Sequence, residues 1–553
     1  MAAVDTVVLV GDNSEAVAPT LLARAPEAVK RTAEAESQEK ALKPEEYNPV
    51  AQNEAAQDNG VDKPGFREKL RALLQEPEGE PSYLMQFLLC AVAALEGADT
   101  ALLPAAMLAL QKDIGLHLSD LAYLSTAQAV CTNLAAPFWG IMADRGILQR
   151  KSILIIGSLG QGFVTCLLAL VTIMGPMIFM RAANGALLAA LRPISNGIVA
   201  DMTAESKRGK MFGRVQSSLM FGMLITTLVA VPMANMEVLG IQGWRVAFCL
   251  IGLVSVIVSA LVLVFMKEPP REEAVNQSEG GGGCKAVVEE IQSLTRFFRI
   301  PTFCVMIMQG IFGTIPWSVM GNMTLYFQLS GMQDSSTALL SSINLIAGMF
   351  GNVIAGYVAD FLAAKFGYHG RPLSAQITVA LGIPCIYMLF YGIYPGEGSF
   401  GGYLTLILAF GLLGSWAQSG TNFPILSAIV PSSARSRIMA WECALENSIA
   451  NALGPMVVAL LATNCFGYRF GETDIVESEE ENLASARALG TAMTVVVCLP
   501  WVICFLAYSI LHWSYPRDMK IQAQEEQKVA AKKAAEPSVQ ISTEAGVDVA
   551  VNV

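Results

Sequence analysis

The stretch GIMADRGILQRK, residues 140–151, ends one apolar segment and places an acid and then basic residues directly after it. A second copy, GYVAD at 356–360, ends another apolar segment and is again followed by bases, Lys365 and Arg371. A third, GIVAD at 197–201, precedes SKRGK. The copies that end at Asp144 and Asp360 fall at equivalent places in the two halves of the chain. This repeat predicts a duplicated fold.

Apolar segments surround these copies. The chain has 553 residues, of which 53% are hydrophobic and 15% charged, whereas soluble domains carry about 25% charged residues. This composition disfavours a cytosolic enzyme, a nucleic-acid binder and a disordered scaffold. A bilayer core needs about 20 apolar helical residues. Twelve stretches are long enough, namely 83–110, 119–142, 151–173, 176–200, 211–234, 244–266, 302–328, 335–359, 372–394, 402–430, 439–462 and 486–511.

We therefore expect an all-α polytopic membrane protein with twelve transmembrane helices in two pseudo-symmetric six-helix bundles. The expected bundles cover 83–266 and 301–511, and a linker with an interfacial helix covers 267–300. An acidic tail with a juxtamembrane amphipathic helix is expected at 1–80, and a second tail at 512–553. Residues 1–60 and 518–553 lack core-forming patterns and are expected to be disordered.

The loop charges predict the orientation, because Lys and Arg mark the cytoplasmic side of a membrane. With the N-terminus inside, sixteen Lys and Arg residues fall in the inner loops and four in the outer loops. Both termini and the linker are therefore expected to be cytoplasmic. The chain shows no secretory signal, so we expect the plasma membrane or an endolysosomal or vacuolar membrane.

Enzymatic and metal motifs are absent from the sequence. Its 11 cysteines have no CxxC spacing and form no zinc or disulfide pattern. The phosphate loop GxxxxGK[ST] and the motifs HExxH and GxSxG do not occur. We expect no cofactor and no metal, and an enzyme is the weakest interpretation.

The loop at 140–151 resembles the loop signature of the major facilitator superfamily, and RAANG at 181–185 resembles its fourth-helix motif. Further stretches resemble the Spinster-like branch, including its plant and algal relatives: KEPPRE (267–272), QGIFGTIPW (309–317), HGRP (369–372), GSWAQSGTNFPILSAIVPSSARSR (414–437) and WECALENSIANALGP (441–455). The resemblance implies a central cavity lined by spans one, four, seven and ten, opened to one side at a time.

In animal Spinster proteins the substrates are lysolipids and phosphorylated sphingoid bases. This chain departs from that branch at two places. Asp99 is followed by Thr100 where we expect an Arg, and residues 182–200 contain no acid. Lipid and polar substrates therefore both stay open.

Placing an ionisable residue inside a membrane span costs free energy, so such residues are expected to be functional. Six occur here: Glu96, Asp99, Arg181, Arg192, Glu442 and Glu446. From the rise of 1.5 Å per residue, Arg181 lies at the depth of Asp99, and Arg192 lies at the depth of Glu442.

These depths lead to two hypotheses. Glu96 and Asp99, balanced by Arg181, form a proton or substrate-cation site, because two nearby acids rarely both ionise; the alternative is a static ion-pair cluster that fixes helix register. An Arg192–Glu442 bridge closes the cytoplasmic exit; the alternative is that Arg192 reaches to the interface without a partner.

Polar residues of the second half are candidates for the substrate path, namely Gln309, Trp317, Asn322, Gln418 and Asn422. The alternative for each is a helix–helix hydrogen bond. Nearby Gly and Pro residues, including Pro316 and Pro424, predict helix bends.

The helix-end motifs are candidates for gating. An acid at a helix C-terminus faces the negative end of the dipole and needs a basic partner or a neighbouring helix N-terminus; the alternative is that these charges only set topology. The gating set comprises Gly140, Asp144, Arg145, Arg150, Lys151, Arg192, Asp201, Arg208, Gly356, Asp360, Arg371, Arg437, Glu442 and Glu446.

The sequence thus predicts a secondary active, proton-coupled carrier of a small organic or amphipathic solute, with lysolipids and sphingolipids among the candidates. The alternative is a receptor or scaffold with the same fold and no net flux. Its expected partners are the bilayer, the solute and protons, with no nucleic acid, and we expect a monomer.

Overall fold

The computed structural model describes residues 81–144, 147–203, 205–268, 292, 294–414, 416–431, 435–470 and 478–535. The predicted N-terminal tail with its amphipathic helix, most of the linker and the last residues of the C-terminal tail lie outside the described residues. Of the predicted interfacial helix, residues 294–297 are described as helical.

The first half of the chain consists of helices joined by short loops. These are α3 (Tyr83–Ile114), α4 (Leu118–Asp144), α5 (Arg150–Leu168), α6 (Met174–Leu188), α7 (Leu191–Met202), α8 (Glu205–Ala234) and α9 (Gly243–Phe265). Helices α6 and α7 together form the fourth predicted span. A two-stranded hairpin, β1 (Glu237–Val238) and β2 (Ile241–Gln242), joins α8 to α9 and was not predicted.

The second half contains several broken helices. Span seven is α11 (Pro301–Val319), the 3₁₀ segment η2 (Met320–Asn322) and α12 (Met323–Leu329). Span ten is α15 (Phe400–Leu413), the π segment η6 (Ala417–Asn422) and α16 (Phe423–Ala428). The remaining elements are α13 (Asp334–Phe366), η3 (Gly367–His369), α14 (Gly370–Tyr387), η4 (Met388–Gly392), η5 (Glu397–Ser399), α17 (Arg435–Asn464) and α18 (Glu479–Ala535).

Each of the twelve predicted segments coincides with a helix or a broken helix of the described chain, so the predicted all-α fold is confirmed. Among the described residues, nine helical runs are long and apolar enough to cross a membrane, and one of them, Asp334–Gly392, has 59 residues and contains two predicted spans. Helix α15 is a shorter apolar helix.

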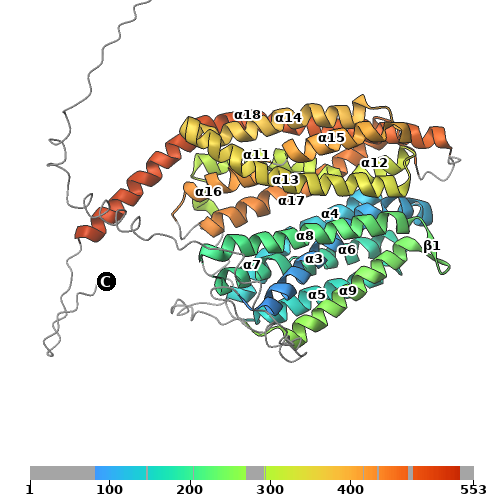
Figure 1. Cartoon of the computed structure of the whole chain (residues 1–553), viewed down its shortest axis with the longest axis horizontal. Coiled ribbons are helices and arrows are strands. Elements are labelled where there is room, and N and C mark those ends of the chain that lie inside the picture. The colour runs from blue at the N-terminus through green and yellow to red at the C-terminus, as the bar shows by residue number, and fades with distance from the viewer. Residues whose placement is uncertain are drawn as a thin grey trace, which may run out of the picture. The chain divides into compact units, whose positions relative to one another are not determined.

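The helices form two groups that follow the sequence (Figure 1). Helices α3–α9, coloured blue to green, make up the first group, and α11–α18, coloured yellow to red, make up the second. Between the groups, α4 packs against α17, α8 against α13 and α3 against α12. The two halves therefore meet along three helix pairs.

Glycines allow the closest helix contact within the first half, between α3 and α8. A Cβ added at Gly222 would collide with the backbone carbonyl of Ala94, and one added at Gly97 would collide with that of Leu219. Small residues of this kind let helix backbones approach each other where lipid supplies no hydrophobic driving force.

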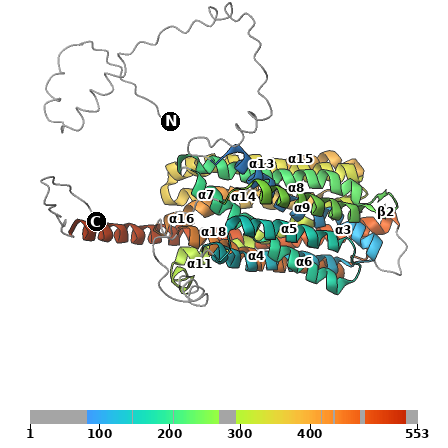
Figure 2. The ribbon, with the colours of Figure 1, turned by 90° about the horizontal axis from the view of Figure 1, so that it is seen from below.

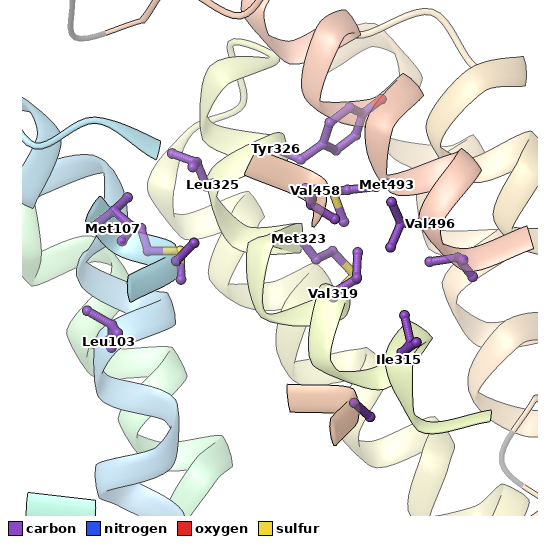
Figure 3. Packing of buried hydrophobic residues seen from close by; sticks show 14 of the residues in the cluster. Leu103, Met107, Ile315, Val319, Met323, Leu325, Tyr326, Val458, Met493 and Val496 are labelled. Carbon is purple, nitrogen blue, oxygen red and sulfur yellow. The ribbon is translucent and has the colours of Figure 1, made fainter. Parts of the chain in front are cut away.

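Apolar side chains join the two halves at one end of the bundle. We call the end at which α3 ends and α4 begins the outer end, and the opposite end the inner end. One buried cluster extends along the second half as far as Phe303 and Tyr515, but its first-half members lie toward the outer end, where Leu103 and Met107 of α3 join Leu325 of α12 and Val458 of α17. Figure 3 shows Leu325 on the side of α12 that faces α3. A second cluster, at the inner end, includes Leu88, Ile153 and Ile198 and consists of first-half residues only.

The expectation of disorder from residue 518 was wrong as far as Ala535. Helix α18 runs without interruption over 57 residues, Glu479–Ala535, and its last part extends beyond the other helices (Figure 2). The segment after 518 is rich in Ala, Glu, Gln and Lys, which are strong helix formers. It also continues a helix that is already formed, so it needs no nucleation step of its own.

We predict that Gly222→Ala lowers stability, because its methyl group would push α3 and α8 apart. Gly213→Ala is the matched control on the same helix, because a Cβ there meets nothing within 4 Å. Replacement of Gly by Ala inside a helix stabilises the helix by about 1 kcal/mol. Thermal unfolding of both purified variants measures this difference. Equal midpoints would contradict the close α3–α8 contact.

Candidate functional site

The ionisable side chains that the sequence placed inside the spans form three groups in the described residues. The Asp99 cluster lies within the first half, the Glu96–Arg192 pair lies beside a small cavity, and the acid pair Glu442 and Glu446 lies in the second half. The sequence predicted their ionisable members but grouped them differently.

The Asp99 cluster connects α3 to three neighbouring helices. Gln128 of α4 donates to Asp99 Oδ2 at 2.8 Å, and Thr165 of α5 and Asn184 of α6 donate to Asp99 Oδ1 at 3.0 and 3.2 Å. Arg181 donates to the Oε1 atom of Gln128. The predicted approach of Arg181 to Asp99 is thus made through Gln128 rather than by direct contact.

The cluster is sealed from solvent. Asp99 and Asn184 are 0% exposed and Arg181 is 1% exposed. Two nitrogens of Arg181, Nε and Nη1, have no hydrogen-bond partner among the described residues. A guanidinium buried in this way depends on a nearby negative charge, and Asp99 supplies it within the same network.

Glu96 belongs to a different site, one helical turn away. Its Oε1 atom forms an ion pair with Arg192 Nη2 at 2.7 Å, and the Arg192 side chain is 59% exposed while that of Glu96 is 10% exposed. The pair lines a cavity of about 140 Å³ between α3, α7 and α8. Its other lining residues are Ala93, Ser195, Asn196, Phe212, Val215, Gln216 and Leu219.

Two predicted groupings are therefore not formed in this structure. Glu96 and Asp99 do not share one site, because they project toward different helices. Arg192 pairs with Glu96 and not with Glu442. The sequence placed Arg192 and Glu442 at the same depth in the membrane. In the structure, Arg192 pairs instead with Glu96, an acid of the same half as Arg192.

Glu442 and Glu446 are buried on consecutive turns of α17, with exposures of 0% and 3%. Cys443 Sγ donates to Glu442 Oε2 at 3.5 Å. One ligand atom from each of Glu442, Cys443 and Glu446 lies within 4.8 Å of the others, so in geometry this group could hold a metal ion.

The other polar candidates of the second half fall into separate environments. Tyr508 donates to Asn422 Oδ1 at 2.9 Å, and Cys504 lies 3.8 Å from Gln309 Oε1. Asn322 donates to its own turn, at Val319 O. Trp317 is 39% exposed and packs against Phe410. The side chain of Gln418 lies outside the described residues.

Two residues of the candidate gating set pair at the inner end of the first half. Arg150, at the start of α5, forms an ion pair with Asp201 of α7. Glu268, which follows α9, accepts the backbone N–H groups of Arg150 at 3.0 Å and Lys151 at 3.1 Å. A carboxylate at a helix N-terminus is favoured by the dipole, so Glu268 ties α9 to α5. The predicted basic partner of Asp201 is confirmed.

In the second half, an arginine again pairs with the acid at a helix end, and it also binds a backbone carbonyl of another element. Arg371 of α14 donates to Asp360 Oδ1 of α13 at 2.9 Å and to the Gly420 carbonyl of η6 at 2.8 Å. Pro424 lacks an N–H group to bond back to Gly420, and Arg371 occupies that carbonyl. Arg371 thus binds the backbone at the bend that was predicted near Pro424. The predicted basic partner of Asp360 is confirmed.

Six members of the gating set give no further contact. The side chains of Asp144, Arg208 and Arg437 and the whole of Arg145 lie outside the described residues. A Cβ at Gly140 or Gly356 would meet no described atom within 4 Å, and close helix approach does not explain these glycines here.

Two hydrogen bonds, one buried and one partly buried, connect the halves at the outer end. Tyr468, which follows α17, donates to Gln111 Oε1 of α3 at 3.1 Å, and Asn235 donates to Asp334 Oδ1 at 3.0 Å. Burial raises the pKa of Tyr468, so its hydroxyl keeps the proton that it donates. These bonds and the apolar side chains join the two halves at the outer end.

Sequence reasoning missed several of these residues. They are Gln111, Gln128, Thr165, Glu268, Tyr468, Cys504 and Tyr508, together with Asn184 as a ligand of Asp99. The available signals were weak, namely single polar residues in apolar segments, and the positions of Asn184 in RAANG and Glu268 in KEPPRE.

Comparison with known families supports the resemblance noted in the sequence. Residues 89–455, more than half of the chain, match the model of the Major Facilitator Superfamily. The chain belongs to the major facilitator superfamily. It is therefore a multi-pass membrane transporter and not an enzyme.

Curated relatives are distant. The multidrug resistance protein MdtG of Proteus mirabilis (strain HI4320) is 25% identical over 343 residues, which cover 61% of this chain and 77% of that protein. The staphyloferrin B transporter of Staphylococcus aureus (strain NCTC 8325 / PS 47) is 27% identical over 218 residues, 39% of this chain and 46% of that protein.

Solved structures confirm the fold. A bacterial homolog to the human lysosomal transporter Spinster, in an inward-facing and occupied conformation, superposes with a TM-score of 0.65 at 16% identity, over 79% of this chain and 98% of that chain. A D-xylose-proton symporter gives a TM-score of 0.56 at 17% identity, over 76% and 97% of the two chains. At these identities the likeness concerns the fold alone.

We predict that Asp99→Asn destabilises the chain by about 3–5 kcal/mol, because it leaves Arg181 as a buried charge without compensation. Asp360→Asn is the control: its side chain is 71% exposed, and loss of a surface ion pair changes stability by at most about 1 kcal/mol. Apparent unfolding midpoints in detergent measure both. If both variants lowered the unfolding midpoint only slightly, the buried charge of Arg181 would not depend on Asp99.

We also predict that Tyr468→Phe weakens closure of the outer end, because Gln111 loses its partner. Removal of one hydrogen bond worth about 1 kcal/mol raises the open population about fivefold. A cysteine placed at Leu103, in the apolar seal, should then react faster with a membrane-impermeant maleimide. The control is Leu103→Cys with Tyr468 intact, and equal labelling rates would argue against the bond as a clamp.

Proposed function

We propose that this transporter is a secondary active, proton-coupled carrier of a small organic or amphipathic solute that works by alternating access. The supporting observation is the asymmetry between its two ends. At the outer end, two hydrogen bonds and apolar residues of both halves join the halves. At the inner end, the described ion pairs Arg150–Asp201 and Arg371–Asp360 each lie within one half, as expected for an inward-facing state.

The Glu96–Arg192 pair is our candidate for the solute-binding group. The Arg192 side chain is 59% exposed, and the cavity beside it has both polar and apolar walls. Its volume of about 140 Å³ is below the 300–1,000 Å³ of drug-sized pockets. This cavity would therefore receive the polar end of a solute, while the rest lies in the path between the halves.

The relatives fit an organic substrate without defining it. Their names specify drugs and staphyloferrin B, and the structural neighbours include a D-xylose-proton symporter and a Spinster homolog. An acid and a base side by side suit a zwitterion, or an anion taken up with a proton. We propose further that the inner end faces the cytoplasm, as the loop charges predict.

A flux screen in proteoliposomes tests the proposal, with lysolipids, organic acids, sugars, amino acids and lipophilic drugs, each with and without a pH gradient. We expect one class to move faster than in empty liposomes and to respond to the gradient. Absence of flux for every class would favour the receptor or scaffold alternative.

For the solute that moves, we expect Arg192→Gln to lower transport at subsaturating concentration about 10- to 100-fold, the equivalent of a charged hydrogen bond of about 1.5–3 kcal/mol. The exchange Glu96→Arg with Arg192→Glu should recover part of the loss. Arg245→Gln, which breaks the Arg245–Asp113 pair outside this cavity, is the control. An unchanged rate in Arg192→Gln would remove the pair from the binding site.

A further inference from the structure

A second cavity lies at the inner end of the second half. It has a volume of about 640 Å³ and is formed where the end of the linker, the start of α11 and the residues after α16 meet the arm of α18, by which we mean residues 512–535. Figure 2 shows α16 and this arm at the same end of the bundle. All of its described lining residues come from the linker and the second half, so it is distinct from the Glu96–Arg192 cavity of the first half.

Three arginines supply the positive charge of this cavity, Arg296 and Arg299 from the linker and Arg517 from the arm. Among the described residues, none of these side chains forms a hydrogen bond or an ion pair. Arg517 packs over the Trp513 ring, 5.4 Å from its centroid. Guanidinium groups present forked donors that match the oxygens of a phosphate group, and here those donors are available.

Two acids also line the cavity, Asp518 and Glu525. Asp518 is 5% exposed and accepts the backbone N–H of Thr302 at 2.9 Å. This contact lies at the start of α11, where the positive end of the helix dipole favours a carboxylate, so the charge of Asp518 is used within the fold. Three positive charges against two negative ones leave the described lining with a net positive charge, which favours an anionic ligand.

The cavity also has an apolar wall, and it lies at the level of the lipid headgroups. Phe297, Ile300 and Ile521 are among its lining residues. Arg517 follows the predicted last span by about 9 Å along the helix, and the headgroup layer extends about 5–7 Å beyond the hydrocarbon core; a long arginine side chain spans the difference. Trp513, one turn earlier, is 62% exposed, and tryptophans are enriched at this interface.

We propose that this cavity binds the headgroup of an anionic phospholipid from the leaflet at the inner end. The arginines contact the phosphate oxygens, and the acyl chains follow the apolar wall into the bilayer. The volume is within the 300–1,000 Å³ of small-molecule sites. Anionic lipids are concentrated in the cytoplasmic leaflet, which the proposed orientation places at this end. A bound headgroup joins the linker to the arm, so this lipid acts on the segment that connects the halves and is not the transported solute.

Native mass spectrometry of the purified full chain in detergent tests this assignment, because each bound lipid adds its own mass. The ligands are dioleoyl phosphatidylinositol 4-phosphate, dioleoyl phosphatidylcholine, and inositol 1,4-bisphosphate as the free headgroup. We expect one copy of the anionic lipid to bind at a concentration at least about tenfold lower than phosphatidylcholine or the free headgroup, because only this lipid offers both an anionic headgroup for the arginines and acyl chains for the apolar wall.

Arg517→Gln should weaken binding of the anionic lipid about 10-fold, the equivalent of one charged hydrogen bond, and the double change Arg296→Gln with Arg299→Gln should weaken it at least as much. Lys520→Gln is the matched control, because it removes the same charge from an exposed position of the same arm that does not line the cavity. It should leave the affinity within about threefold. Arg517→Lys keeps the charge without the fork and should fall between the control and Arg517→Gln.

Three outcomes would overturn the proposal. Equal losses in Lys520→Gln and Arg517→Gln would show diffuse attraction to surface charge. Equal binding of phosphatidylcholine would show that the arginines do not select the lipid, and a free headgroup that binds as tightly as the lipid would make a soluble anion the ligand. Size-exclusion profiles verify that each variant is folded, and the linker double variant carries the test if Arg517→Gln is not.

Discussion

A charge inside an apolar bundle must be neutralised by its surroundings, and this requirement determines how the first half of the transporter is held together. Asp99 binds side chains of α4, α5 and α6, and Glu96 binds Arg192 of α7. One helix, α3, is therefore connected to most of its half through its two acids. The cost of leaving either acid without its partners makes these contacts obligatory in every state in which the acids stay buried. Such a half moves as one body.

The sequence was sufficient for the spans but not for the partners. Each span is a long apolar segment, so hydropathy located all twelve, and the breaks near Pro316 and Pro424 followed from their missing N–H groups. Depth along the membrane correctly brought Arg181 to the level of Asp99. Depth contains no information on helix rotation, however. Glu96 and Asp99 differ by about 60° around α3, which is enough to direct them to different helices, and the same limitation led to the wrong partner for Arg192.

The helix-end acids Asp201 and Asp360 have similar surroundings, although the counterpart of Asp360 in the first half is Asp144. Asp201 receives Arg150 from α5, whereas Asp360 receives Arg371 from α14, and that arginine also holds the Gly420 carbonyl of the broken span ten. In the first half, the additional anchor is Glu268 at the start of α5. Each half thus combines an acid, an arginine and a third group. The third group is Glu268 in the first half and the Gly420 carbonyl in the second. Its identity depends on local backbone breaks that the repeat itself does not specify.

Helix α18 has a mechanical consequence. Its 57 residues span about 85 Å at 1.5 Å per residue, whereas the hydrocarbon core of a bilayer is about 30 Å thick. The part after the predicted last span is thus an arm of roughly 35 Å that continues helix α18 of the second half and contains Pro516. A tilt of that half by about 10° would sweep the tip of the arm by about 6 Å, given that length. Movements within the membrane are therefore magnified at Ala535, where the described helix ends.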